Sequence, residues 1–419
     1  MCSIQRIYKT PSWFIATQVH LHGALHVPCK RQRDNRTIKG SIQMKQTSKE
    51  TQNKAVSVQV MRDSDAWTIA NKVPSKELMF RAGKGIFEAV DWKGPVAIVC
   101  GSGNNAGDGY VVADLLHGSG IRCTIVLLSE KFSEDGAYYF EQCKEHGVPV
   151  TMFPEEEPEL FFQEYKMILD CILGTGFSGE VHGKAAEAID AINASGAYVV
   201  SADINSGLNG DTGRGTRYVR SDLTVSIGDY KFGHFKGLAA AAMKEKVNID
   251  IGIELCEEAV PVEEPFKILV FSDSHGRKGK VKKILESHKD PDAVIFLGDG
   301  EADLELLNLS EDTALYQVRG NCDRVSRAAV TLVEEIAGVR FYITHGYEQG
   351  VKYGLGKFAA LAKEEGCRAA LFGHTHRVHL SEEDGVFLFN PGSAANGDYG
   401  MILIDGETLD FVPLSLTGV

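Results

Sequence analysis

The stretch from Phe266 to Gly276 reads FKILVFSDSHG, an apolar run that ends in Asp273 and His275 before a glycine. Four similar runs follow it: AVIFLGDG, ALYQVRGNCD, VRFYITHG and RAALFGHTHR. They contribute Asp299, Asn321, His345, His374 and His376. Each run is rich in Val, Ile, Leu or Phe, which is typical of a buried strand. The polar residues therefore stand where strands leave the core, which is where open α/β sheets place their sites.

These residues have the composition of a metal centre. Two Asp, one Asn and four His supply about eight donor atoms if Asp299 is counted twice as a bridge, which is enough for two metal ions. Imidazole and carboxylate together suit Mn, Fe, Zn or Co better than Mg or Ca, which prefer oxygen ligands. The residue types do not choose among the first four, and we take Mn²⁺ as the working expectation. Isolated polar residues at strand ends would explain any one of the seven, but not all seven in this order.

The order D-x-H, G-D, G-N-x-D, H-G, G-H-x-H resembles that of the calcineurin-like metallophosphoesterases, the small YfcE-type phosphodiesterases among them. The resemblance implies a four-layer αββα domain over residues 266–419 that hydrolyses phosphodiesters or phosphomonoesters at a dinuclear centre. It divides the ligands between two metals: Asp273, His275, Asp299 and His376 for one, and Asp299, Asn321, His345 and His374 for the other. Asp299 and Asn321 would be catalytic. Cys322 stands where many members have histidine, a variant similar to the YfcE-type branch and to the related retromer-subunit fold.

Composition and charge limit the class of protein. A chain of 419 residues is expected to form two or three domains, and 43% hydrophobic with 24% charged residues is ordinary for a globular protein. Residues 1–54 carry ten Lys or Arg against two acidic residues, a local charge of about +8. Because the net charge of the chain is −13, the remaining residues carry about −21. An acidic body argues against a general nucleic-acid surface, because phosphate backbones need a basic footprint.

The spacing of the cysteines and the length of the apolar runs indicate the cellular compartment. Nine cysteines without CxxC pairs indicate reduced thiols, and no apolar run approaches the roughly 18 residues of a membrane span. We therefore expect a cytoplasmic protein without a membrane segment, and a homo-oligomer is compatible with these features.

The first 54 residues show no sustained helical or strand period, and we predict that they are disordered. Two other interpretations stay open. A basic, acid-poor leader is typical of organelle presequences, and the segment could equally be an upstream extension before a true start near Met44.

Strands and helices alternate between residues 55 and 255. PVAIVC, RCTIVLL, KMILDCILG and AYVVSAD have strand composition, and helical segments such as GYVVADLLHGSG lie between them. This rhythm predicts a mostly parallel, Rossmann-like sheet in a three-layer αβα domain. Residues 256–265, with two Pro and several Glu, are the predicted linker to the metal domain.

A glycine-rich loop, GSGNNAGDG over residues 101–109, lies between the strand PVAIVC and a helix. Glycines let the backbone approach a phosphate, and a helix N-terminus offers unpaired N–H groups. Such a turn is common without a ligand. Two further strand ends strengthen the interpretation: Asp170 with GTGFSGE over residues 174–180, and ADINSGLNGDTG over residues 202–213.

The three stretches resemble the GxGNNGGDG, DxxxGTG and DIPSGL patterns of the NAD(P)H-hydrate epimerases, the YjeF N-terminal family. The resemblance implies an isomerase that interconverts the R and S forms of hydrated NAD(P)H with the help of K⁺. It places the dinucleotide against two segments: Asn104, Asn105, Ala106, Gly107 and Asp108, and Gly174, Thr175, Gly176, Phe177, Ser178, Gly179 and Glu180. Asp203 would contact the reacting ring. Asn105, Asp170 and Ser206 would hold K⁺.

Asp203 is also the chemical candidate for catalysis, because inversion of a hydroxyl-bearing carbon needs proton transfer and a buried carboxylate can perform it. The chain departs from the family pattern at Ala106, where the family has glycine, and at Asn205, where it has proline. We expect Lys231, in DYKFGHFKG, to be a solvated loop lysine rather than a cation of the pocket.

Together these motifs predict a bifunctional enzyme. The alternative is that one half is a non-catalytic module, either a nucleotide sensor or a protein-docking scaffold. The epimerase family is often fused to a dehydratase of ribokinase type, and nothing in this chain resembles that domain. Repair of hydrated NAD(P)H would therefore need a separate NAD(P)H-hydrate dehydratase, and the natural phosphoester is left open.

Overall fold

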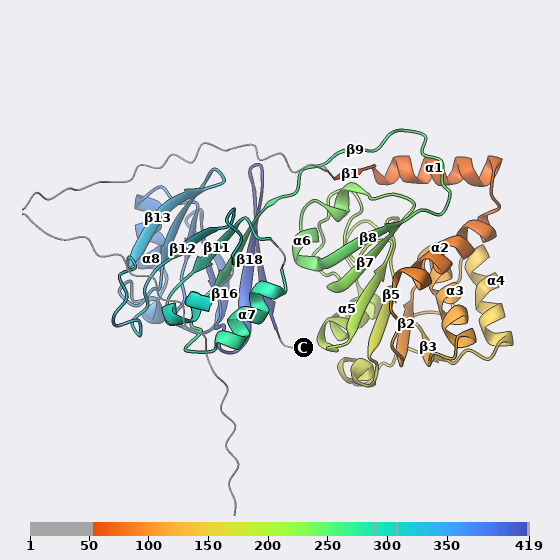
Figure 1. The fold of residues 1–419 in the computed structure, drawn as a ribbon, viewed down its shortest axis with the longest axis horizontal. Coiled ribbons are helices and arrows are strands. Elements are labelled where there is room, and N and C mark those ends of the chain that lie inside the picture. The colour runs from red at the N-terminus through yellow and green to blue at the C-terminus, as the bar shows by residue number, and fades with distance from the viewer. Residues whose placement is uncertain (1–52, 289, 307–308, 417–419) are drawn as a thin grey trace, which may run out of the picture. The chain divides into compact units, whose positions relative to one another are not determined.

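The computed structural model describes residues 53–416 apart from residues 289 and 307–308 (Figure 1). The leader predicted over residues 1–54 lies outside this part except for its last two residues. Within the described ranges, none of the helices is long and apolar enough to cross a membrane. The described chain forms two α/β domains, as predicted.

The N-terminal domain is built on a seven-stranded sheet in which every neighbouring pair is parallel. In spatial order the strands are β4 (Val150–Met152), β3 (Cys123–Leu127), β2 (Val96–Cys100), β5 (Met167–Cys171), β6 (Tyr198–Ala202), β7 (Ser221–Ile227) and β8 (Met243–Ile249). The chain winds outward from β2 to β4 on one side and from β5 to β8 on the other. The order therefore reverses between β2 and β5, and ligands of open α/β sheets bind at such a switch point.

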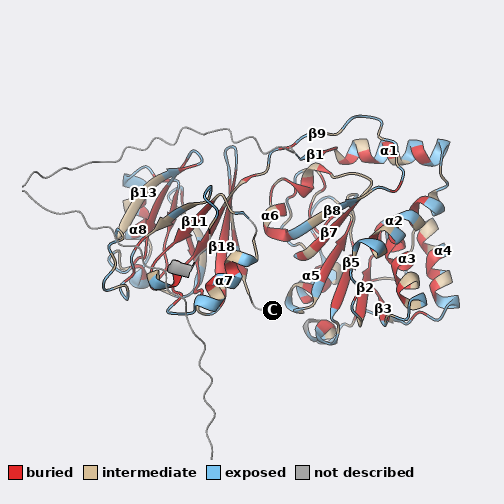
Figure 2. Cartoon of the chain, in the orientation of Figure 1, coloured by how far each residue is buried: buried red, intermediate tan, exposed pale blue. Residues whose placement is uncertain are grey.

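Helices cover both faces of this sheet. Figure 2 shows its central strands in the buried colour, whereas the edge strand β8 is partly exposed. The helices of the domain are α1 (Val58–Asn71), α2 (Ser75–Ala89), α3 (Asn104–Gly118), α4 (Glu134–Glu145), α5 (Gly183–Ala194) and α6 (Ala239–Ala242), with the 3-10 turns η1 (Pro158–Glu164) and η2 (Phe232–His234). Alternate residues of β2 face opposite ways. Ile98 packs with α2, α3 and α4, whereas Val99 packs with α5 and η1. The predicted three-layer αβα arrangement is confirmed.

The segment predicted as a linker contains a short strand. β9 (Val260–Pro261) pairs with β1 (Lys54–Ala55) in antiparallel register, with Ala55 opposite Val260. Ala55 and Val262 are buried together with Phe235. This pairing therefore holds together the two chain segments that begin and end the N-terminal domain.

The C-terminal domain contains two five-stranded mixed sheets. The first holds β12 (Ala314–Gln317), β11 (Ala293–Phe296), β10 (Phe266–Phe271), β18 (Asp398–Asp405) and β19 (Thr408–Ser415). The second holds β13 (Thr331–Ile336), β14 (Val339–Thr344), β15 (Ala369–Leu371), β17 (Val386–Pro391) and β16 (Val378–Glu383).

The two sheets pack face to face. Residues of both sheets, such as Val270, Ile343 and Phe389, share one core. On the outer faces lie α7 (Lys278–Glu286) and α8 (Gly356–Glu364), each packed on its own sheet, with the 3-10 turns η3 (Glu301–Leu306) and η4 (Val351–Tyr353). This is the predicted four-layer αββα arrangement.

Candidate functional sites

A cavity of about 560 Å³ opens at the switch point of the N-terminal sheet. All three sequence motifs contribute to its wall: Asn104, Asn105 and Asp108 from α3, Gly174–Phe177 after β5, and Asp203 after β6. The structure thus gathers most of the predicted binding residues in one place. Ala106 and Gly107 are buried but do not line the cavity, and neither do Ser178, Gly179 and Glu180.

The start of α3 is suited to an anion. Its N-cap, Gly103, makes no side-chain capping bond, and Ser102, Gly103 and Asn104 all line the cavity. Free N–H groups at a helix N-terminus are donors for phosphate oxygens. Gly107 is a packing residue, because a Cβ there would lie 2.4 Å from the sulfur of Met79. Ala106 lies within α3 and in the core, so alanine in place of the family glycine fits without strain.

The three residues assigned to K⁺ meet beside the backbone of Leu173. The Ser206 hydroxyl donates to Asp170 Oδ1 at 2.5 Å, and the backbone N–H of Leu173 donates to Ser206 Oγ at 2.8 Å. Asn105 Nδ2 donates to the carbonyl of Leu173 at 3.2 Å, and its Oδ1 is buried with no hydrogen-bond partner among the described residues. Burial raises the pKa of Asp170, although hydrogen bonds from Ser206, Ile172 and Ser201 oppose this effect. An orphaned amide oxygen beside a buried carboxylate fits a monovalent cation.

Asp203 lies in the wall of the cavity in a left-handed conformation, with φ 63°. Its Oδ1 is 2.5 Å from Lys231 Nζ, and Thr175 Oγ1 donates to its Oδ2 at 3.0 Å. Burial works to raise the pKa of Asp203, but the charge and hydrogen bond of Lys231 outweigh it, and the pKa falls below its ordinary value. Asp203 is thus an ionised carboxylate that could accept a proton.

The expectation that Lys231 is a solvated loop lysine was wrong. Its side chain is 2% exposed, and Nζ donates to the carbonyl of Ile227 at 2.8 Å as well as to Asp203. A buried lysine needs a charge partner, and Asp203 supplies one from a distant part of the sequence.

Two further residues of this site were missed by sequence reasoning. His234 is buried; its Nδ1 accepts from the backbone N–H of Lys231 at 3.0 Å, so its Nε2 donates to the Asp203 carbonyl at 2.7 Å. Burial lowers the pKa of His234 to about 4, which keeps the ring neutral. Asp65 reaches the cavity from α1. Only the GHFK and RDSD contexts mark these residues in sequence, and neither is specific.

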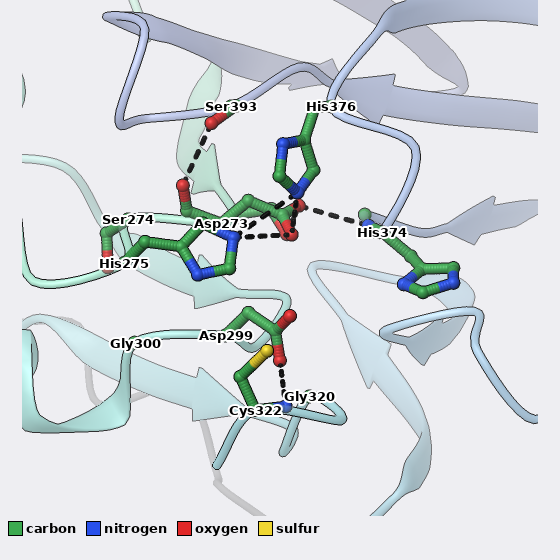
Figure 3. A network of polar contacts seen from close by, with 12 residues as sticks. Asp273, Ser274, His275, Asp299, Gly300, Gly320, Cys322, His374, His376 and Ser393 are labelled. Carbon is green, nitrogen blue, oxygen red and sulfur yellow. Dashed lines mark hydrogen bonds and ion pairs between the residues drawn. The ribbon is translucent and has the colours of Figure 1, made fainter.

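Three predicted metal ligands of the C-terminal domain, Asp273, His275 and His376, converge (Figure 3). His376 Nε2 and His275 Nε2 lie 3.0 and 3.7 Å from Asp273 Oδ1, and 3.3 Å from each other. The buried Asp273 Oδ1 has no hydrogen-bond partner within the described ranges. Two imidazole nitrogens that point at one orphaned carboxylate oxygen are a donor set for a divalent metal.

A second group surrounds Asp299. His345 Nε2 lies 3.4 Å from Asp299 Oδ2 and 3.2 Å from Asn321 Oδ1, while Asp273, Asp299 and His345 together offer ligand atoms within 4.8 Å of one another. Burial works to raise the pKa of Asp299, but hydrogen bonds from His345 and from the Cys322 N–H hold the pKa well below its usual range. Asp299 offers a ligand atom close to those of Asp273 and His345 and also to that of His275, so it lies near residues of both groups.

His374 is the predicted ligand that stands apart. Figure 3 shows its ring pointing away from Asp273, to which only its backbone N–H donates, at 3.0 Å. The ring centre lies 5.1 Å from that of His345 and 5.3 Å from that of Tyr347. His374 thus borders the Asp299 group next to His345 but belongs to none of the close groups of ligand atoms found among the described residues.

The ligand loops are strained. Five of the seven predicted ligands are non-glycine residues with positive φ: Asp273 at 54°, His275 at 44°, Asp299 at 61°, His374 at 64° and His376 at 57°. Such conformations cost free energy and collect at functional sites, where the surrounding structure enforces them.

Two carboxylates outside the predicted set hold these loops. Asp323 accepts hydrogen bonds of 2.8–3.0 Å from four backbone N–H groups, those of Asp299, Gly300, Glu301 and Gly320. Asp303 accepts from the Ser274 hydroxyl at 2.6 Å and from the N–H of Gly276 at 2.9 Å. Cys322 is exposed, and its backbone N–H donates to Asp299 Oδ1 at 2.7 Å.

Comparison with known proteins matches each half separately. The family model of the YjeF-related protein N-terminus matches residues 75–233, and that of the calcineurin-like phosphoesterase superfamily domain matches residues 266–406. An NAD(P)H-hydrate epimerase of Lentilactobacillus buchneri is 36% identical over 210 residues, which cover 48% of this chain and 94% of that protein.

Longer relatives share only part of their length with this chain. A bifunctional NAD(P)H-hydrate repair enzyme of Coxiella burnetii is 33% identical over 222 residues, which cover 51% of this chain and 43% of that protein. The chain thus spans less than half of that relative. The crystal structure of a conserved uncharacterised protein of Streptococcus pneumoniae, described as a predicted phosphoesterase, is 24% identical with a TM-score of 0.32, covering 37% of this chain and 91% of that chain.

Proposed function

The chain belongs to the NAD(P)H-hydrate epimerase family and also carries a calcineurin-like phosphoesterase domain, and we propose that it is a bifunctional enzyme. The N-terminal domain interconverts the R and S forms of hydrated NAD(P)H. The C-terminal domain hydrolyses a phosphodiester or phosphomonoester. A separate NAD(P)H-hydrate dehydratase would complete the repair.

The observation that carries the first activity is the ionised Asp203 in the wall of a cavity that the N-terminus of α3 also lines. The dinucleotide phosphates would lie at Ser102, Gly103 and Asn104, and the hydrated ring beside Asp203. In this position Asp203 accepts a proton during inversion at the hydroxyl-bearing carbon. Lys231 keeps the carboxylate charged, and Thr175 orients it.

Potassium would be held by Asn105, Asp170 and Ser206, whose oxygens suit a hard monovalent ion. Bound K⁺ would supply positive charge and fix the turn after β5, to which Thr175 belongs. The residues themselves already tie that turn to β6 through the Leu173 backbone.

The proposal for the C-terminal domain rests on the convergence of Asp273, His275, Asp299, His345 and His376. Two divalent ions, Mn²⁺ by our expectation, would supply Lewis acidity and an activated water. Asp299 would join the two sites, and the Asn321 amide would lie beside the phosphoryl oxygens. A neighbouring cavity of about 390 Å³, lined in part by Arg319, Arg324 and Tyr347, offers room for the rest of the substrate.

Each half has its own test. Purified protein incubated with a single hydrate epimer, with and without K⁺, should give the epimeric mixture on chiral chromatography faster than buffer alone. Elemental analysis should find close to two divalent metals per chain, and a panel of nucleotide and phospholipid-headgroup diesters should reveal a hydrolysed class. A protein that binds dinucleotide without interconverting the epimers, or that holds no metal, would favour the non-catalytic alternative for that half.

A further inference from the structure

Epimerisation needs a proton donor as well as the base Asp203, and the same cavity contains a candidate; this inference rests on the proposed epimerase function. The charged side chains that line the cavity are Arg62, Asp65, Asp108, Asp135, Asp203 and Lys231. The only buried cation among them, Lys231, is bound to Asp203. Lys231 is therefore not available as the ion-pair partner of Asp65, Asp108 or Asp135.

Asp108 is the most buried of the unpaired carboxyl groups. Its residue is 8% exposed, and it lies in α3 five residues after the N-cap, facing the cavity. Among the described residues, its carboxyl oxygens make no hydrogen bond or ion pair, and the residue lines the cavity. A buried carboxylate without a partner is costly, whereas the protonated acid is neutral and keeps a proton to donate.

We propose that Asp108 is the acid of the epimerase reaction, a neutral carboxyl group that protonates the departing hydroxyl of the hydrated ring while Asp203 serves as the base.

The environments of the two residues support opposite roles. Burial raises the pKa of Asp108 well above its usual value, and the negative charges of Asp203 and Asp65 raise it further against a smaller opposing effect of Lys231. Lys231 lowers the pKa of Asp203. Neighbouring carboxyl groups whose pKa values are driven apart are the common arrangement for an acid and a base in one site.

Asp108 and Asp203 together account for the protons that are transferred during epimerisation. An electron pair of the adjacent ring nitrogen forms a C=N bond as the C–O bond breaks, and the departing oxygen takes the proton of Asp108 and leaves as water. Water then adds to the opposite face of the carbon, the C=N pair returns to nitrogen, and Asp203 takes the proton that the water loses. Asp108 ends ionised and Asp203 protonated, so the reverse epimerisation uses the two residues in exchanged roles.

The decisive variant is Asp108→Asn, which matches the neutral acid in size and charge but has no acidic proton. We expect unchanged thermal stability and dinucleotide affinity, and a fall in kcat of about 100-fold or more, the usual contribution of a general acid. Epimerisation in ¹⁸O-labelled water, followed by mass spectrometry, should introduce solvent oxygen with each turnover of the wild type and lose this exchange in the variant. The matched control is Asp91→Asn, an exposed carboxyl-to-amide change in the same domain but outside the cavity, which should keep wild-type rates.

A second measurement does not depend on activity. Infrared difference spectroscopy of the full chain at pH 7 should show the carbonyl stretch of a protonated carboxylic acid that is absent from Asp108→Asn and present in Asp91→Asn. Absence of this band in the wild type, or near wild-type turnover by Asp108→Asn, would overturn the role of Asp108 while leaving the epimerase function standing. A wild-type chain that does not interconvert the epimers would overturn the proposed function itself.

Discussion

At the scale of single residues, the ion pair of Asp203 with Lys231 determines how a mutation of Asp203 should affect activity and stability. Asp203→Asn removes the base, and kcat for epimerisation should fall by about 100-fold to 10,000-fold. It also leaves Lys231 charged and buried without a partner, which should cost about 3–5 kcal/mol of stability. The double variant Asp203→Asn with Lys231→Met should recover stability but not activity. Recovery of activity in the double variant would refute Asp203 as the base.

His234 gives a pH dependence with a defined sign. Burial lowers its pKa from 6.5 to about 4, so the unfolded chain takes up a proton before the folded chain does as the pH falls. The stability that neutral His234 contributes is complete above pH 6.5 and should be lost between pH 6.5 and pH 4, by about 3 kcal/mol at 1.36 kcal/mol per pKa unit. Urea unfolding followed by tryptophan fluorescence reports this domain, because Trp67 and Trp92 both lie in it. His234→Gln should flatten the dependence, and an unchanged slope would contradict the assignment.

Asp299 and Cys322 are neighbours with very different expected effects. Asp299→Ala removes the carboxylate that stands between the two ligand groups, so both bound metal and hydrolysis should be lost. Cys322→Ala removes an exposed thiol but keeps the backbone N–H that donates to Asp299. We expect its metal content, measured by elemental analysis, to stay near that of the wild type. Equal loss in the two variants would give the thiol a direct role in metal binding.

At the scale of elements, the loops that follow β11 and β12 are held by one side chain. Asp323→Asn places an amide NH₂ against backbone N–H donors. Because each carboxylate oxygen accepts two of the four charge-assisted hydrogen bonds, two are lost, each worth about 1.5–3 kcal/mol. We expect Asp299 to move and the metal content to fall. Asp312→Asn, an exposed change of the same kind in this domain, is the control and should leave metal content unchanged. A variant that keeps its metals would show that backbone strain at Asp299 survives without Asp323.

At the scale of the whole molecule, each domain has its own sheets, hydrophobic core and candidate site. We expect residues 53–263 and 264–419, expressed separately, to fold and to retain their individual activities. The first fragment must extend beyond β9, because a fragment that ended before β9 would lack the partner strand of β1. Circular dichroism and the two activity assays test this expectation, and failure of either fragment to fold would mean that the domains depend on each other.

The sequence by itself determined the fold class of both domains and the identity of most candidate site residues. Strand composition is local, and parallel strands bring their carboxyl ends to one edge of a sheet. Asp203 and the glycine loop, or Asp273 and His376, could therefore be assigned to common sites before their distances were known.

Only the tertiary structure decided which of these residues are paired, ionised or orphaned. Lys231 was misjudged because its burial depends on Asp203, 28 residues earlier, and no local pattern encodes that contact. The same holds for Asp323, whose carboxylate accepts from four N–H groups of folded loops, and for Asp108, whose carboxyl group lines the cavity while Lys231 is bound to Asp203. The charge state and burial of a site residue depend on contacts between segments that are distant in sequence. The types and the order of the candidate ligands are set by the sequence alone.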